Sequence, residues 1–225
     1  MEREEAIKQL QEALGVLIPE LNETNREKQD EGFDNNDAEY HPLMIDLGLP
    51  SGRLWADRNV GAKSPEDDGL YFSWGNTVGY AADEEHDFSE DEYNNTPGSE
   101  VKECILPSSS DDAAYENTSQ VELPVFMPRM ADFAELVDYC DHEWVERNGV
   151  KGMLFKSRGN NNSIFFPASG YRYGTGLYGR GSYGYYWSSS LQSQAYGYNL
   201  YFSSGGVSPA NNYNRFYGFS VRAVQ

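Results

Sequence analysis

Histidine and cysteine side chains are the first candidates for catalytic chemistry, but their positions in the sequence do not predict a catalytic site. The three histidines are His41, His86 and His142, and no local motif places one of them as a base beside a nucleophile. The two cysteines, Cys104 and Cys140, form no CxxC pair, and their spacing permits one disulfide without arguing for it. The sequence therefore predicts no catalytic residue, and we expect the protein not to be an enzyme.

Carboxylates that could hold calcium gather in residues 83–100, DEEHDFSEDEYNNTPGSE. The regular ligand spacing of an EF-hand loop is absent, so a solvated acidic loop is the preferred interpretation. Residues 159–225 contain no Asp, Glu, Lys or His. Calcium-dependent sugar binding through this last part of the chain is therefore not expected, and we expect neither a metal nor another cofactor.

Four residue types dominate the last third of the chain. Residues 159–225 hold 11 Tyr, 11 Gly, 11 Ser and 7 Asn in 67 positions. Antibody binding sites use the same types, because Tyr is a large and stiff contact, Ser and Asn adapt their hydrogen bonds, and Gly lets loops turn. The composition thus indicates a ligand-binding surface. Half-buried sheet tyrosines with hydroxyls in water would explain it equally well.

Strands are the elements expected to position these side chains. Short strand-like runs recur as SIFFPAS, GYYWSSS, YNLYFSS and FSVRAV. In 198–203 the even positions are expected to face a core and the odd positions solvent. The apolar residues that would anchor this region are Trp187, Leu200, Phe202, Val207, Val221 and Val224.

The rest of the chain predicts two helices and a hairpin. Apolar residues at helical spacing predict a helix over 2–18, followed by an acidic linker at 22–39. Residues 1–38 are therefore expected to precede a domain of residues 39–225. The apolar stripe of the first helix either docks on its own domain or forms a homo-oligomer seam. A hairpin is predicted within 44–62 and a second helix over 129–141.

Net charge excludes one class of partner. Residues 1–125 carry 30 acids and 8 bases, whereas residues 126–225 carry 6 acids and 9 bases. Nucleic acid is not expected as a partner, because phosphate binding needs clustered Lys and Arg. The sequence lacks a run of about 18 apolar residues, so we expect no membrane insertion. It also shows no secretory signal, which favours a virion component or a protein that is cytoplasmic as synthesised, with surface display as a further option.

Three blocks of sequence carry a resemblance to a known family. They are LPSGRLWADRNVGAKSPEDDGLYFSWG (49–75), MPRMADFAELVDYC with W and NGVKG downstream (127–152), and the segment from SIFFPASGYR to FSVRAV (163–224). Together they resemble the C-type-lectin-fold variable proteins of diversity-generating retroelements, found in gut bacteria and their phages. The resemblance implies an α+β, C-type-lectin-like fold with small irregular antiparallel sheets, two helices and long loops.

The resemblance also implies a ligand-binding region that varies, at about residues 170–225. In such systems a reverse transcriptase copies a template with errors at adenines, so variable positions hold residues reachable from AAY codons. The candidate ligand-binding residues are Tyr173, Tyr178, Tyr183, Tyr185, Tyr196, Asn199, Tyr201, Ser203, Ser208, Asn211, Asn212, Tyr213, Asn214, Phe216 and Tyr217. The scaffold residues expected to hold them are Tyr186, Trp187, Leu200, Phe202, Arg215 and Arg222, with Val207, Gly218 and Val221 as further anchors. Gln192 and Gln194 depart from the pattern.

The implied function is display of a surface that binds a protein or a glycan on a target cell, as in phage receptor binding. A structural or assembly module without a diversified surface is the alternative. Formylglycine-generating enzymes share a related fold, but they use a cysteine pair late in the chain, and no cysteine follows Cys140. That chemistry is therefore not supported.

Overall fold

The computed structural model describes residues 42–118 and 124–225. The chain divides into two units, and all described residues belong to the second, Glu39–Gln225. The helix expected at 2–18, the linker at 22–39 and self-association through that helix lie outside the described residues. Within the described ranges, no helix has the length and apolar character needed to cross a membrane.

The fold is mostly β, with 39% of the described residues in strands and 12% in helices. The strands are β1 (Met44–Asp46), β2 (Leu54–Ala56), β3 (Tyr71–Phe72), β4 (Cys140–Arg147), β5 (Val150–Ser157), β6 (Ser163–Pro167), β7 (Tyr171–Tyr173), β8 (Gly176–Tyr178), β9 (Tyr183–Leu191), β10 (Tyr196–Ser203), β11 (Gly206–Asn214) and β12 (Phe219–Ser220). The helices are α2 (Glu90–Tyr93), the 3-10 helix η1 (Pro97–Glu100), α3 (Ala113–Glu116) and α4 (Met130–Tyr139).

The expected α+β, C-type-lectin-like class with two helices is therefore wrong. The described residues contain three short α-helices, of which only α4 exceeds one turn, and several small sheets. The physical reason is the pattern of the second half of the chain, where two-residue alternation and turn glycines recur and helical spacing is confined to the α4 segment. No lectin fold is identified by these elements.

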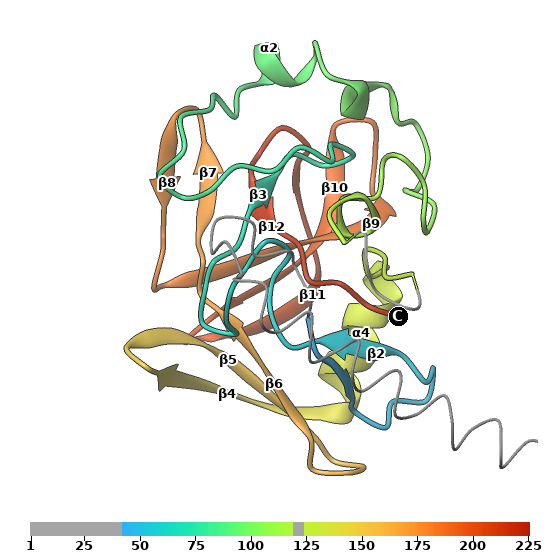
Figure 1. Ribbon diagram of the computed structural model, residues 1–225, viewed down its shortest axis with the longest axis vertical. Coiled ribbons are helices and arrows are strands. Elements are labelled where there is room, and N and C mark those ends of the chain that lie inside the picture. Colours follow the sequence, from blue (N-terminus) through green and yellow to red (C-terminus); the bar gives the residue numbers. More distant parts are fainter. Residues whose placement is uncertain (1–41, 119–123) are drawn as a thin grey trace, which may run out of the picture. The chain divides into compact units, whose positions relative to one another are not determined.

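Four sheets organise the described residues (Figure 1). The largest has the strand order β11-β10-β9-β12-β3, in which only the β12–β9 pair is parallel. The β4-β5-β6 sheet is antiparallel, and β1–β2 and β7–β8 are two-stranded hairpins. Pairing of β1 with β2 confirms the hairpin predicted within 44–62. The run FSVRAV, by contrast, is a strand only at Phe219–Ser220.

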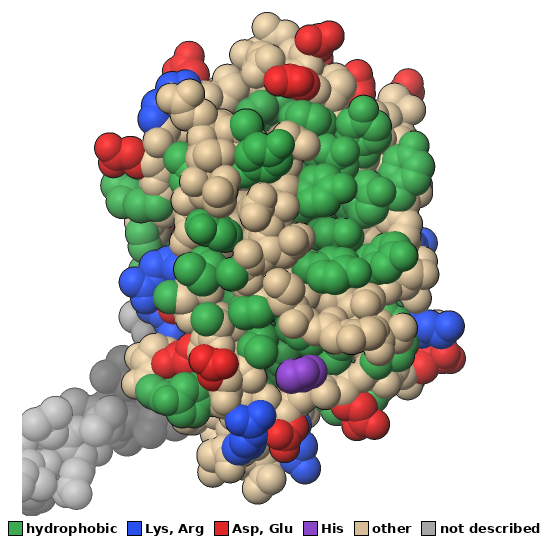
Figure 2. Space-filling view, turned by 180° about the vertical axis from the view of Figure 1, so that it is seen from behind, with side chains coloured by type: hydrophobic (Ala, Val, Ile, Leu, Met, Phe, Trp, Pro, Cys, Tyr) green, Lys and Arg blue, Asp and Glu red, His purple; other side chains and the backbone are tan. Residues whose placement is uncertain are grey.

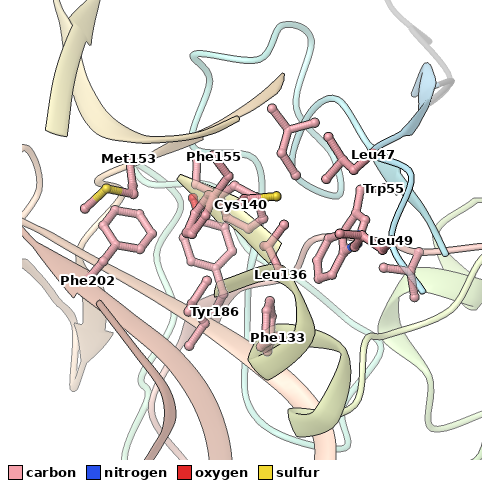
Figure 3. Packing of buried hydrophobic residues seen from close by; sticks show 14 of the residues in the cluster. Leu47, Leu49, Trp55, Phe133, Leu136, Cys140, Met153, Phe155, Tyr186 and Phe202 are labelled. Atoms are coloured by element: carbon pink, nitrogen blue, oxygen red, sulfur yellow. The ribbon is translucent and has the colours of Figure 1, made fainter. Parts of the chain in front are cut away.

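Two apolar clusters pack on the two faces of the five-stranded sheet. The first contains Leu200 and Phe202 from β10 and Tyr186 from β9, with Phe133 and Leu136 from α4 packed against them (Figure 3). The second cluster contains Trp187 and Phe219 together with Trp74 from the loop after β3. Since neighbouring residues of a strand point to opposite faces, Tyr186 and Trp187 enter different clusters and hold the sheet from both sides.

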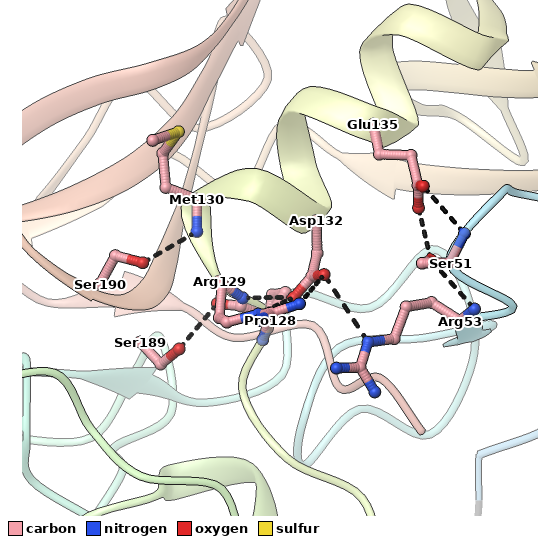
Figure 4. Close-up of polar contacts among 9 residues, drawn as sticks. All are labelled: Ser51, Arg53, Pro128, Arg129, Met130, Asp132, Glu135, Ser189 and Ser190. Carbon is pink, nitrogen blue, oxygen red and sulfur yellow. Dashed lines mark hydrogen bonds and ion pairs between the residues drawn. The ribbon is translucent and has the colours of Figure 1, made fainter.

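Helix α4 confirms the helix predicted at 129–141, and its start is tied to the sheet (Figure 4). Asp132 accepts a hydrogen bond from the Arg129 backbone N–H at 2.8 Å, which satisfies a free donor of the first turn. The backbone N–H groups of Ser189 and Met130 connect the two elements, donating to the Pro128 carbonyl at 2.8 Å and to Ser190 Oγ at 3.1 Å. The helix thereby fixes the end of β9.

The acidic segment 83–100 has its carboxylate residues exposed, as expected for a solvated loop, but it also contains helical turns. It contains α2, capped by the Ser89 side chain, and η1. The Tyr93 ring is buried, and its hydroxyl donates to the carbonyls of Trp74 at 2.8 Å and Gly98 at 2.9 Å. This segment covers part of the second cluster. The two cysteines are free, Cys104 being exposed and Cys140 buried.

Candidate functional site

Nine aromatic side chains of the C-terminal third form one network of ring contacts, here named the tyrosine surface. Its members are Tyr171, Tyr173, Tyr178, Tyr183, Tyr185, Tyr201, Tyr213, Phe216 and Tyr217. They come from five strands, β7 to β11, and from the turn after β11. Figure 2 shows hydrophobic side chains, tyrosine included in that colour, gathered on one side of the face turned away in Figure 1, with charged side chains at the margins.

Strand β9 supplies two of these tyrosines by alternation. Tyr183 and Tyr185 lie on the same face as Trp187, whereas Tyr186 lies on the opposite face, in the core beside α4. Towards the exposed end of the strand, the exposed fraction rises from zero at Trp187 to 40% at Tyr183. A single strand therefore carries a buried anchor at one end and a contact residue at the other.

Strand β10 places Tyr201 directly opposite Tyr185 in the ladder. Their ring centroids are 5.0 Å apart, and the Tyr183 ring is 6.1 Å from that of Tyr201. Leu200 and Phe202, on either side of Tyr201, are wholly buried on the other face. Cross-strand aromatic pairs of this kind stabilise the sheet by their own contact, in addition to offering a surface.

The β7–β8 hairpin brings in Tyr171, which the sequence analysis did not include. Its ring contacts the rings of four other members, Tyr178 at 5.6 Å, Tyr185 at 5.4 Å, Tyr213 at 6.4 Å and Tyr217 at 5.8 Å. The sequence feature that could have identified Tyr171 is its two-residue spacing from Tyr173 in the segment YRY, which places both side chains on one face of a strand. Tyr171 is half-buried at the centre of the network, so it joins the hairpin to the main sheet.

The end of β11 and the following turn complete the surface. The Tyr213 and Tyr217 rings lie 4.5 Å apart, and Tyr217 stacks on Tyr173 of the hairpin at 4.9 Å. Phe216 lies 5.0 Å from Tyr217. Segments separated by some 40 residues in the chain thus share one aromatic layer. Tyr173 and Tyr178 are the most exposed members, at 46% and 47%.

The surface is uncharged and rich in hydroxyl groups. Burial among neighbouring rings raises the pKa of Tyr217 to about 12, and burial also raises the pKa values of Tyr171 and Tyr185. The hydroxyls therefore remain protonated at neutral pH and can both donate and accept hydrogen bonds. Ring faces with such polar edges suit contact with a folded protein or with a sugar.

A rigid floor supports the tyrosine surface. Phe219 of β12 stacks on Trp187 at 4.2 Å and lies 4.9 Å from the Tyr185 ring. The indole Nε1 of Trp187 donates to the Phe72 carbonyl at 2.8 Å, and that of Trp74 donates to the Ser188 carbonyl at 2.8 Å. Both indoles are buried, and their polar atoms are hydrogen-bonded, so the floor has a defined geometry.

The two scaffold arginines are buried and bind backbone carbonyls. Arg222 donates to Asn59 Oδ1 at 3.0 Å and to the carbonyls of Ala56 at 3.0 Å and Phe165 at 2.9 Å, which joins three segments. Arg215, 3% exposed, donates to the Gln194 and Gly98 carbonyls and lies over the Trp74 ring. The remaining predicted scaffold residues, Tyr186, Trp187, Leu200 and Phe202, are wholly buried, as is the further anchor Val221. Gly218 is buried as well, whereas the anchor Val207 is only partly buried.

One candidate ligand-binding residue is in the wrong place. Asn199 is wholly buried and lies opposite the buried Trp187 in the ladder. Its Oδ1 accepts a hydrogen bond from Asn211 Nδ2 at 3.1 Å. Alternation correctly predicts that Asn199 lies on the same face of the sheet as Tyr201. That part of the face, however, is covered by other residues. The pairing of β10 with both neighbouring strands, β9 and β11, shifts register next to Asn199.

The other candidates make no ring contacts with the network, and three of them, Tyr196, Asn212 and Asn214, lie by alternation on the opposite face of the sheet, that of Leu200 and Phe202. Tyr196 is 39% exposed at the far end of β10, where it pairs with Asn214. Asn212 is exposed on the edge strand β11. The remaining polar candidates, all partly exposed, are Ser203, Ser208, Asn211 and Asn214. A hollow of about 460 Å³ adjoins the network, lined by Tyr183 and Ser203 together with Trp144 and Lys151.

The next question is whether side chains converge to hold a metal ion in the part of the chain that the structure describes. No group of three or more His, Cys, Asp or Glu side chains there is placed to hold a metal ion. His86 stacks on Tyr80, and His142 lies near Phe155, each in an aromatic contact. Burial raises the pKa of the Cys140 thiol to about 11, so this cysteine is a poor nucleophile at neutral pH.

Comparison with known proteins gives a match for the C-terminal part of the chain. Residues 136–224, which contain the whole tyrosine surface, match a family model described as a domain of unknown function, DUF8237. No curated protein and no solved structure gives a match to the chain. The C-terminal half is therefore similar to a family defined by sequence, whose description assigns it no function.

Proposed function

We propose that the protein binds a protein or glycan on the surface of a target cell through the tyrosine surface, and does not catalyse a reaction. The observation that carries this proposal is the convergence of nine aromatic side chains into one partly exposed, uncharged layer. Large exposed aromatic patches on a protein mark interaction sites, because they otherwise lower solubility. Tyrosine is also enriched at the energetic centres of interfaces.

The alternation of outward and buried side chains along β9 and β10 supports diversification of this surface by a retroelement. Tyr183, Tyr185 and Tyr201 lie on one face, while the frame beneath depends on buried neighbours such as Tyr186 and Phe202. Outward residues can therefore change without loss of the core, which a mutagenic reverse transcriptase requires of its target. Phage receptor binding or recognition at a cell surface would use such variation.

Comparison of many independent copies of the gene, together with the DNA that flanks it, tests the proposal. We expect a reverse transcriptase gene beside a near-copy of the codons for about residues 170–225. Differences between copies should occur at outward positions such as Tyr183 and Tyr201 and be absent at Tyr186 and Trp187. Absence of the repeat here and in related loci, or equal variation at Trp187, would refute diversification.

Binding is tested separately from diversification. Replacement of Tyr173, Tyr183 and Tyr201 by Ala, in a chain whose melting temperature is retained, should abolish adsorption to target cells. An unchanged interaction with every partner would instead support a structural or assembly module.

A further inference from the structure

A second candidate binding site adjoins the tyrosine surface, since Ser73 in its lining donates a hydrogen bond to the Phe216 carbonyl at 3.1 Å. A cavity of about 410 Å³ is enclosed by residues 73–97 together with Ser110 and Asp111. None of the nine members of the tyrosine surface lines it. Its volume falls within the range of about 300–1,000 Å³ that is typical of small-molecule sites. We refer to it as the Tyr80 cavity.

Three aromatic rings form one wall of the Tyr80 cavity. Tyr80 and His86 stack with their centroids 3.6 Å apart and their planes within 5° of parallel. Phe88 lies edge-on to both, 4.6 Å from His86 and 5.9 Å from Tyr80. Burial lowers the pKa of His86, so its ring is neutral at neutral pH. The wall therefore presents apolar ring surface, although Tyr80 and His86 each cover one face of the other and the guanidinium of Arg172 lies 5.0 Å from the centroid of the Phe88 ring.

Backbone pairing holds this wall in place before any ligand arrives. Tyr80 exchanges two backbone hydrogen bonds with Tyr71 of β3, at 2.9 and 3.0 Å. Phe88 exchanges two with Gly174, at 2.8 and 3.1 Å. Behind the wall, the buried guanidinium of Arg172 donates to the Ala81 carbonyl at 3.0 Å and to the His86 carbonyl at 3.3 Å. A preformed wall lowers the entropic cost of binding.

Negative charge surrounds the cavity. The carboxylates of Glu92 and Asp111 line it, and within the described ranges neither forms an ion pair. Residues 81–118 carry 12 acids and a single base, Lys102. An anion would be repelled, and a neutral ligand would bring no charge to oppose the two carboxylates. A cation carried on an apolar body can meet the carboxylates with its charge and the ring surface of the wall with its body.

We propose that the Tyr80 cavity binds a small organic cation, an amine or guanidinium group carried on a flat or alkyl body. The charged group lies towards Glu92 and Asp111, and the apolar body lies against Tyr80, His86 and Phe88. The Thr and Ser hydroxyls of the lining, such as Thr77 and Ser110, accept hydrogen bonds from the cation. The proposal is independent of the tyrosine surface.

Isothermal titration calorimetry of the full chain with 2-phenylethylamine tests the charge requirement. The matched probes are 2-phenylethanol, which is neutral, and 3-phenylpropionate, which is an anion of similar size. We expect the amine to bind about ten-fold more tightly than either, since each of the two carboxylates at the cavity contributes modestly to an ion pair with the amine. Equal affinity for amine and alcohol, or no binding of the amine, overturns the proposal.

Variants locate the site. Glu92→Gln should weaken amine binding about three- to ten-fold, while Glu90→Gln, in the same helix but outside the lining, should leave it unchanged. Tyr80→Leu should weaken it further by removal of the stacked wall. Melting temperatures verify that each variant is folded. An equal effect of Glu92→Gln and Glu90→Gln would show that general acidity of the region, rather than the cavity, attracts the amine.

Discussion

Gly184 is the position at which the frame of the tyrosine surface is most sensitive to one added methyl group. It lies directly opposite Phe202 in the β9–β10 ladder. A Cβ atom added to it would lie 2.1, 2.4 and 2.5 Å from three atoms of the Phe202 ring. That ring is wholly buried and stacks on Tyr186 at 5.8 Å, so it cannot move aside without displacing the core.

The expected cost of Gly184→Ala follows from two opposing effects. Overpacking of a core costs about 1–3 kcal/mol, and three ring atoms within 2.5 Å place this case at the upper end. Restriction of the unfolded chain by Ala recovers about 0.4–1 kcal/mol. The net loss is about 2 kcal/mol, which corresponds to a fall in melting temperature of about 4–8 °C for a domain of this size.

Urea titration and thermal melting, followed by tryptophan fluorescence, measure this loss. Gly205→Ala is the matched control, because only Ser203 Oγ, at 3.5 Å, lies near its added Cβ. Adding Phe202→Leu to Gly184→Ala should recover stability, with a coupling energy of about 1 kcal/mol or more between the two changes. The packing argument is refuted if Gly184→Ala and Gly205→Ala have the same melting temperature. It is also refuted if the loss of stability in the double variant equals the sum of the losses in the two single variants.

Three further predictions concern burial and charge. Trp187→Ala should lower the free energy of unfolding by about 3–5 kcal/mol, and Tyr201→Ala should lower it by far less, because of the two side chains only the indole is wholly buried. Urea titration measures both losses, and equal losses would contradict a sheet with a buried anchor beneath an outer layer of tyrosines. Arg222→Lys should cost about 2–4 kcal/mol in the same assay, since the three donors of an ammonium share one nitrogen and cannot reach acceptors that lie around a planar guanidinium; a loss below 1 kcal/mol would show that water replaces the guanidinium. Burial raises the pKa of Asp112 from 3.8 to about 6, so its ionisation is less favourable in the folded state. Unfolding experiments at several pH values should therefore show wild type losing stability relative to Asp112→Asn as pH rises from 3.8 through about 6, and a constant difference would contradict the shift.

Local patterns in the sequence predicted several elements correctly. Helical spacing of Phe133 and Leu136 marks α4, and turn residues between two alternating runs mark the β1–β2 hairpin. The even positions Leu200 and Phe202 are buried as alternation predicts. These signals survive in isolation because side-chain direction repeats every 3.6 residues in a helix and every two in a strand. The fold class could not be derived in this way, since it depends on how the elements pair.

Residue type alone also misplaced or missed members of the site. Asn199 belongs to the outward set by composition and alternation, yet long-range packing covers its part of the sheet. Tyr171 was missed because its role depends on docking of the β7–β8 hairpin against β9 and Gly218, not on its neighbours in the chain. The Tyr80 cavity was also missed, because its lining joins residues 73–80 to part of the segment 83–100, interpreted as a solvated acidic loop, and to Ser110 and Asp111.

By itself, the sequence determined the chemistry of the C-terminal third: an uncharged supply of tyrosine, serine, asparagine and glycine in strand-like alternation. Only the tertiary structure decided which of those tyrosines meet, because rings from β7 and β11 become neighbours through contacts between distant strands. Composition is a property of a segment, whereas a surface is a property of the packing that selects one face of each strand for solvent and the other for the core.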